Sequence, residues 1–233
     1  MYMTVLEIKD LDVSYGESKI ITGLNLSVSE GETVTIMGRN GMGKTTLMKA
    51  LIGLLPLDKG SIFVMGQDLS KSESHKRVSA GMGYIPQGRM IFPYLTVQEN
   101  LLVGMETVID RQIPEFVYDV FPVLKEMKDR RGGNLSGGQQ QQLAIARALV
   151  SKPKILLLDE PTEGVQPSII KDIARILGEL KSSLGFSLLV AEQALIFALE
   201  ISDRFVIIEK GEIVHQATRL DMNESEIRSY LTI

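Results

Sequence analysis

The sequence predicts one α/β domain built around a mainly parallel β-sheet. Strand-like runs occur at Val5–Ile8 and Thr33–Met37, and a glycine-rich turn and a helical pattern over Lys44–Ile52 follow the second run. In the second half of the chain, apolar runs alternate with helical patterns, and this order typically builds a parallel sheet. At 233 residues, the chain is long enough for a single domain with a sizeable core.

The strands of the second half are expected to be buried on both faces, because their apolar runs show no alternation with polar residues. The predicted strands are Ile155–Leu158, Ser187–Ala191 and Phe205–Ile208, and the predicted helices are Ile169–Leu180 and Ala194–Ile201. The middle region, from about Phe92 to Val150, carries helical spacing without convincing strands. We expect a helical insertion there.

Composition limits the possible functions. Lys and Arg number 25 against 29 Asp and Glu, a formal net charge of −4, without the basic block that a nucleic-acid-binding surface needs, so DNA and RNA are not expected partners. The chain has no cysteine, which excludes disulfides and thiolate metal sites. No apolar run approaches the roughly 20 residues of a membrane-spanning helix, and the N-terminus lacks a signal-peptide pattern. We therefore expect a protein of the cytoplasmic side. The charged stretch Lys71–Arg77 is expected to be a solvated surface segment.

The segment Gly38-Arg39-Asn40-Gly41-Met42-Gly43-Lys44-Thr45 matches G-x-x-x-x-G-K-[ST] between a predicted strand and a predicted helix. Glycines allow backbone N–H groups to turn toward phosphates, and the helix N-terminus adds positive potential. Lys44 supplies a mobile cation, and the Thr45 hydroxyl suits Mg²⁺. A chance glycine-rich turn is the alternative, and the complete pattern in its correct context makes it improbable.

Two carboxylates, Asp159 and Glu160, end a buried strand. An acidic residue at a strand tip can hold Mg²⁺, and a second one can polarise an attacking water during phosphoryl transfer. Acidic residues end many strands, so this pair gains weight from the phosphate loop. We assign the metal to Asp159 and the water to Glu160.

The segment Leu135-Ser136-Gly137-Gly138-Gln139, followed by a helical run to Leu149, resembles the signature of the ABC ATPases. The order of motifs along nearly the whole chain agrees with that family. The resemblance implies a phosphate-loop NTPase fold with an N-terminal antiparallel β subdomain and a helical signature subdomain. It divides the single domain 1–233 into a core of 1–87 with 151–233 and a signature subdomain of 88–150.

The resemblance also implies the site and its partners. The ATP contacts would be Tyr15, Gly38, Arg39, Asn40, Gly41, Met42, Gly43, Lys44, Thr45 and Thr46. The Mg²⁺ contacts would be Thr45, Gln87 and Asp159. Catalysis would rest on Glu160, Gln193 and Lys44. Leu135, Ser136, Gly137, Gly138 and Gln139 would close on the ATP of a second ATP-binding subunit, identical or related. Further partners would be integral membrane permease subunits and, indirectly, a solute-binding protein.

Two departures from the general ABC pattern narrow the group. Gln166 stands at the usual D-loop aspartate, and Gln193 stands at the usual switch histidine, a place that neither His75 nor His215 can take; both are expected to be surface or edge residues. Glutamine donates a hydrogen bond but carries no proton at neutral pH, so catalysis depends more on Glu160. The pair Glu192-Gln193 resembles ATP-binding subunits of branched-chain amino acid and urea importers.

Within that group, Gln87, the run Gln139–Gln142 and the segment Thr162–Ile170 resemble the urea branch. We expect an importer of urea or short-chain amides, attached to the cytoplasmic face of the membrane. Branched-chain amino acid import is the alternative cargo. A non-transport ABC ATPase is a further alternative, and the absence of room for a coiled-coil insertion or a second ATPase half argues against it.

Overall fold

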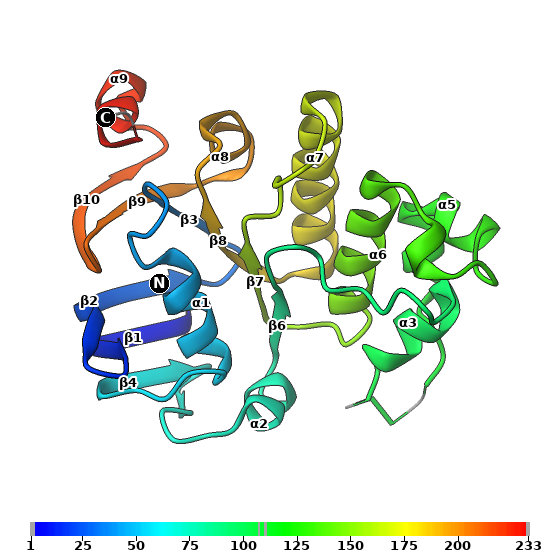
Figure 1. The fold of residues 1–233 in the computed structure, drawn as a ribbon, viewed down its shortest axis with the longest axis horizontal. Helices are drawn as coiled ribbons and strands as arrows, with labels where there is room; N and C mark the ends of the chain where they lie inside the picture. Colours follow the sequence, from blue (N-terminus) through cyan, green and yellow to red (C-terminus); the bar gives the residue numbers. More distant parts are fainter. Residues whose placement is uncertain (1–2, 107, 110, 232–233) are drawn as a thin grey trace.

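Two β-sheets with helices around them make up the described residues 3–106, 108–109 and 111–231 of this computed structural model (Figure 1). The larger sheet has the strand order β10-β9-β3-β8-β7-β6. Its strands are β3 (Thr33–Met37), β6 (Met82–Ile85), β7 (Ile155–Asp159), β8 (Ser187–Glu192), β9 (Arg204–Glu209) and β10 (Glu212–Thr218). All neighbouring pairs from β9 to β6 are parallel, and β10 is antiparallel to β9. The predicted parallel sheet is confirmed.

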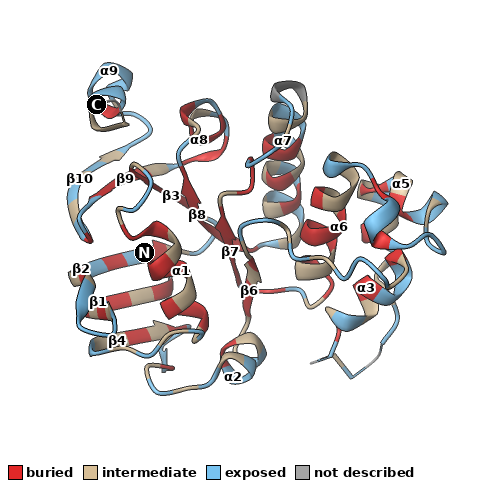
Figure 2. Ribbon diagram, viewed as in Figure 1, coloured by how far each residue is buried: buried red, intermediate tan, exposed pale blue. Residues whose placement is uncertain are grey.

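The unbroken apolar runs have the predicted physical cause. Every residue of β3, β7 and β8 is buried, and Figure 2 shows these strands in red at the centre of the molecule. A strand covered on both faces has no solvent side on which a polar residue is needed.

The smaller sheet is antiparallel, with the order β2-β1-β4-β5. Its strands are β1 (Thr4–Tyr15), β2 (Ser18–Ser29), β4 (Lys59–Val64) and β5 (Gln67–Asp68). Strand β1 extends far beyond the predicted run Val5–Ile8. Its register to β2 shifts between Ile8 and Leu11, where Asp10 has a φ of 51°, so a bulge joins two stretches of different phase.

Helices cover the large sheet and form the end of the molecule away from the small sheet (Figure 1). They are α1 (Lys44–Ile52), α2 (Ser74–Ser79), α3 (Val97–Val103), α4 (Glu115–Val120), α5 (Pro122–Glu126), α6 (Gly137–Leu149), α7 (Pro167–Leu184), α8 (Leu195–Ile201) and α9 (Glu224–Leu231), with a 3₁₀ turn at Gly132–Asn134. The helices predicted at the positions of α1, α7 and α8 are confirmed, and α7 is longer than predicted.

The core has two large parts on opposite faces of the main sheet. On one face, α1 packs with the small sheet through residues such as Leu47, Leu11 and Ile62. On the other face, helices of the 88–150 segment share a hydrophobic cluster with the sheet and α7, through residues such as Leu143 and Leu158. The loop that follows β3 leads directly into α1. It therefore lies at the carboxyl end of β3, above the core.

The prediction that Lys71–Arg77 is solvated is wrong for Arg77, which is 2% exposed. Its guanidinium donates to the carbonyl oxygens of Ala50 and Leu51, both at 2.8 Å. These carbonyls belong to the last turn of α1, where few intrahelical donors remain, and the Ala50 oxygen also accepts from the Gly53 N–H at 3.1 Å. Burial lowers the pKa of Arg77. The hydrogen bonds that Arg77 donates to the carbonyl oxygens at the end of α1 offset the cost of this desolvation.

Candidate active site

The loop 38–43 joins β3 to α1 and has the shape of an anion cradle. Gly41 and Gly43 have φ angles of 79° and 105°, which other residues rarely adopt. A Cβ atom on Gly38 would lie 2.4 Å from the carbonyl oxygen of Ile208. The backbone therefore needs glycine both for its turn and for its close packing against β9.

Lys44 begins α1 and is 4% exposed. Its Nζ donates to the carbonyl oxygens of Gly38, at 2.8 Å, and Arg39, at 3.1 Å. It also forms an ion pair with Glu160 Oε1 at 3.4 Å. The cation thus lies beneath the loop, close to the carboxylate predicted to act on water.

Asp159 ends β7 and is 1% exposed. Its Oδ1 accepts from the Thr45 hydroxyl at 3.0 Å, and its Oδ2 accepts from the Tyr84 hydroxyl at 3.5 Å. Burial raises the pKa of Asp159 to about 6, and the nearby charge of Glu160 adds to the increase. Among the described residues no ion pair involves Asp159, so a divalent ion would stabilise the charge of this buried carboxylate.

The oxygen atoms around Asp159 suit magnesium. Mg²⁺ binds through one or two carboxylates together with substrate phosphates and water, rather than in a cage of protein ligands. In the described part of the chain, no group of three or more His, Cys, Asp and Glu forms such a cage. Thr45, Asp159 and the amide oxygen of Gln87 would hold the ion, whose charge would offset that of the phosphates.

Glu160 has a strained backbone, with a φ of 47°. Its N–H donates to the carbonyl oxygen of Ala191 on β8 at 2.8 Å. Its Oε2 accepts from the Gln87 side chain at 3.3 Å. The carboxylate is therefore held between Lys44 and Gln87 at the mouth of the loop, where a water attacking a bound phosphate would lie.

Lys44, Thr45, Gln87 and Glu160 line one cleft with a volume of about 430 Å³, and Asp159 lies outside its lining. The residues that line it are Ile20, Asn40, Gly41, Gly43, Lys44, Thr45, Thr46, Gln87, Glu160 and Glu163. Sequence reasoning missed Ile20 and Glu163, and it also missed Tyr84, which contacts Asp159. Tyr84 lies on β6 three residues before Gln87, and its contact with Asp159 depends on the pairing of β6 with β7, which no local pattern reveals.

Several predicted residues lie outside the lining of this cleft. Tyr15 is 47% exposed at the end of β1, and Gln193 is exposed directly after β8. Arg39 donates through Nε to the carbonyl oxygen of Tyr230, and the carbonyl oxygen of Met42 accepts from the N–H of Gly211. These two loop residues contact the C-terminal part of the chain in the described structure.

The segment predicted to be the signature lies at the start of α6. Ser136 caps this helix: its Oγ accepts from Gln139 N–H, and Gln139 Oε1 accepts from Ser136 N–H at 2.9 Å. Ser136 and Gly137 are exposed, whereas Leu135 is buried. None of Leu135, Ser136, Gly137, Gly138 and Gln139 lines the cleft around Lys44.

Neither histidine belongs to the cleft. The His75 side chain is 68% exposed on α2, and His215 lies on the edge strand β10, with its ring stacked on Tyr230 at 5.8 Å. Both positions agree with the expectation of surface or edge residues.

A phosphate loop with a buried lysine, a strand-end carboxylate pair and a second capped anion site together define a nucleotide-binding cassette. The family model described as ABC transporter matches residues 21–163. The chain belongs to the ABC transporter family and is an ATPase cassette that takes ATP with Mg²⁺.

Similar proteins agree with this assignment. The chain is 39% identical over 217 residues to the high-affinity branched-chain amino acid transport ATP-binding protein BraG of Pseudomonas aeruginosa, covering 92% of this chain and 93% of that protein. It is 37% identical to the spermidine/putrescine import ATP-binding protein PotA of Haemophilus influenzae over 94% of this chain, and it spans 59% of the length of PotA. An ADP-bound ATP-binding cassette, MJ1267, has a TM-score of 0.80 at 30% identity and covers 98% of this chain and 95% of that chain.

Proposed function

We propose that this chain hydrolyses ATP as one half of a head-to-tail dimer and thereby powers an ABC importer. The observation that carries the proposal is the separation of the two anion sites. The cleft around Lys44 has a cation, carboxylates and a loop for phosphates, and it opens to solvent. The exposed cap at Ser136 has the chemistry to close such a cleft, but only on another subunit.

The contacts of the cleft support a division of labour. Phosphates entering the loop would replace the carbonyl oxygens that Lys44 contacts, and would draw its charge from Glu160. Glu160 would then be available to orient and polarise water, which is the main need of a loose phosphoryl-transfer transition state. Gln193 would donate a hydrogen bond to the γ-phosphate without supplying a proton.

An apolar groove supports docking to a permease. It has a volume of about 390 Å³ and lies between the core and the 88–150 segment. Its lining includes Leu54, Met90, Phe92 and Val103, each at least 42% exposed. Arg147 lies 5.2 Å from the centre of the Phe92 ring, which holds this aromatic side chain at the groove. An apolar helix end from a membrane subunit is the partner that this lining would take.

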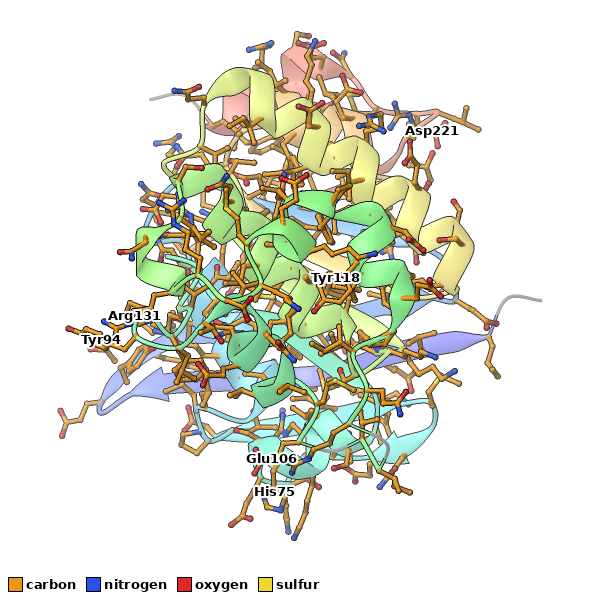
Figure 3. The ribbon with its side chains drawn as sticks, turned by 90° about the vertical axis from the view of Figure 1, so that its right-hand side faces the viewer. His75, Tyr94, Glu106, Tyr118, Arg131 and Asp221 are labelled. Carbon is orange, nitrogen blue, oxygen red and sulfur yellow. The ribbon has the colours of Figure 1, made fainter. Side chains whose placement is uncertain are left out.

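Two polar side chains belong to the lining of the groove. His75 and Glu106 line the same groove, and Figure 3 shows them near each other at the lower edge of the molecule.

In the described part of the chain, no helix combines the length and hydropathy needed to cross a bilayer. The proposed place of the chain is the cytoplasmic face of the membrane, bound to permease subunits, together with an identical or related ATPase subunit and, indirectly, a solute-binding protein.

The cargo is proposed from sequence alone. Gln87, Gln139–Gln142 and Thr162–Ile170 favour urea or short-chain amides. Branched-chain amino acids are the second candidate, and the similarity to BraG favours them. PotA, a relative of greater length, is named for spermidine/putrescine import. Putrescine is therefore a third substrate in the test.

Uptake in cells with and without this gene tests the cargo. Labelled urea, leucine and putrescine are compared, and loss of urea uptake alone would support the first candidate. Loss of leucine uptake with urea uptake unchanged would favour the second. Loss of none of the three would reject both cargo candidates.

Lys44→Ala tests the ATPase itself. Removing the cation should weaken MgATP binding and abolish phosphate release, because no other side chain of the loop replaces it at the phosphates. Lys171→Ala, at an exposed position of α7, is the control and should retain wild-type turnover. Wild-type activity in a folded Lys44→Ala protein would contradict the proposed site.

A further inference from the structure

Glu192 is a buried carboxylate that the chemistry above does not use. It ends β8, directly before Gln193, and is 3% exposed. Its Oε2 accepts from the Thr162 hydroxyl at 2.8 Å and from the Thr162 N–H at 3.3 Å. Its Oε1 accepts from the N–H groups of Gln193 and Ala194, at 2.8 and 2.9 Å.

This carboxylate joins the two loops that carry the predicted catalytic residues. Thr162 lies two residues after Glu160, in the loop that follows β7. Gln193 begins the loop that follows β8. A short path therefore runs from Glu160 through Thr162 and Glu192 to Gln193, in addition to the backbone bond from Glu160 to Ala191.

The ionised form of Glu192 suits these contacts, but its burial costs desolvation free energy. All four donors point at carboxylate oxygens, so the ionised form accepts every one of them. Among the ion pairs of the described residues, none involves Glu192. Burial raises the pKa of Glu192, while its hydrogen bonds act in the opposite direction. A buried carboxylate without a cation partner costs desolvation free energy that an apolar side chain would avoid. Stability alone therefore does not explain Glu192 at this position.

The strained backbone at Glu160 indicates what the Glu192 carboxylate stabilises. A φ of 47° at a non-glycine residue persists only where surrounding contacts hold the backbone. The bond to Ala191 holds one side of Glu160, and the Thr162–Glu192 contact holds the loop on its other side. Small displacements of a group that orients water cost large factors in rate.

We propose that Glu192 is a positioning residue for ATP hydrolysis, which fixes the loop of Glu160 relative to Gln193 so that both side chains meet the attacking water. The inference rests on the proposed ATPase function. It assigns no contact with ATP to Glu192, which acts only through Thr162 and the backbone of Gln193.

Two isosteric substitutions test it. Glu192→Gln keeps the volume but turns an amide N–H₂ toward backbone donors, and Thr162→Val keeps the shape but removes the hydroxyl. Each should lower kcat by about 10–100-fold, the usual range for residues that orient a catalytic group, with KM for MgATP unchanged. Thr162→Ser retains the hydroxyl and should restore most of kcat. The double variant should lose little more than either single variant, because both remove the same contact.

Equilibrium binding of a fluorescent ATP analogue and thermal unfolding accompany the kinetics, so that lost folding is separated from lost turnover. If Glu192→Gln does not fold, Thr162→Val and Thr162→Ser decide. Wild-type kcat in folded Thr162→Val, or a loss that appears in KM alone, would overturn the inference. Absence of turnover in the wild-type protein would instead reject the proposed function, so the two failures are distinguishable.

Discussion

Burial raises the pKa of Asp159 to about 6, because desolvation outweighs the hydrogen bonds from Thr45 and Tyr84. The value in the folded protein lies above the ordinary 3.8, so folding favours the protonated carboxyl. The stability that this provides is fully present below pH 3.8 and is lost as the pH rises through about 6. At neutral pH the nucleotide-free protein therefore carries a destabilising charge at its metal site.

Asp159→Asn should remove that charge. A shift of about two units corresponds to roughly 3 kcal/mol, so the variant without nucleotide should be more stable than wild type near neutral pH by up to that amount. The difference should vanish near pH 4. Urea unfolding across pH measures it, and Asp172→Asn, at an exposed position of α7, is the control. A stability difference that does not change with pH would contradict the assignment.

Substitution of Gln193 should lower the rate of ATP hydrolysis less than substitution of Glu160. Gln193 is exposed after β8 and would contribute one hydrogen bond, whereas Glu160 alone would polarise water. Gln193→Ala should therefore lose less turnover than Glu160→Gln. Removing one positioning donor costs at most about 10²–10³ in rate. Single-turnover phosphate release compares the two variants, and equal losses would contradict the order.

At the scale of elements, the best predictions concern segments whose local pattern and tertiary position agree. The helix α1 has the predicted bounds, and β3 does too, because a run rich in β-branched residues before a glycine-rich turn is typical of a strand. The resemblance predicted the antiparallel N-terminal subdomain that contains β2, but no residue pattern was used to locate β2 or β10. In β2 the alternation of Leu24, Leu26 and Val28 with polar residues was present, but it follows the left-handed Gly23 that divides the strand.

The site shows the same limit. The phosphate loop and the pair Asp159-Glu160 were found because each is contiguous in sequence. The contacts of Tyr84 and Glu192 were not found, since they join segments that meet only through the pairing of β6, β7 and β8. Arg77 was misassigned for a related reason: a charged run predicts exposure, and two of the carbonyl oxygens that accept from its guanidinium lie 26 and 27 residues earlier.

Arg77→Ala should destabilise the end of α1. The substitution removes the guanidinium from the carbonyl oxygens of Ala50 and Leu51, and the Ala50 oxygen keeps the Gly53 N–H. Loss of a buried hydrogen-bond donor costs about 1–3 kcal/mol. Lys76→Ala, at the exposed neighbour, should change stability by less than about 0.5 kcal/mol. Chemical denaturation compares the two. Equal effects would show that α1 does not depend on the Arg77 contacts.

At the scale of the whole molecule, one subunit holds two anion sites that do not share a cleft. The cap at Ser136 precedes α6 in the helical part of the molecule, and Lys44 begins α1 on the opposite side of β7 in Figure 1. In the proposed head-to-tail arrangement, a second subunit supplies the Ser136 cap that closes on the nucleotide. We therefore expect a lone subunit to turn over slowly.

Glu160→Gln should trap that pair. The amide is isosteric and leaves Lys44, Thr45 and Asp159 to bind MgATP, but it polarises water poorly, so the closed state should accumulate. Light scattering after size separation should give a dimer in saturating MgATP and a monomer without nucleotide. Adding Ser136→Arg should abolish the dimer, because the larger side chain would occupy the place of the partner's γ-phosphate. Ser182→Arg, exposed on α7, is the matched control and should leave the dimer intact. A monomer of Glu160→Gln in saturating MgATP, or a dimer that tolerates Ser136→Arg, would reject the head-to-tail arrangement.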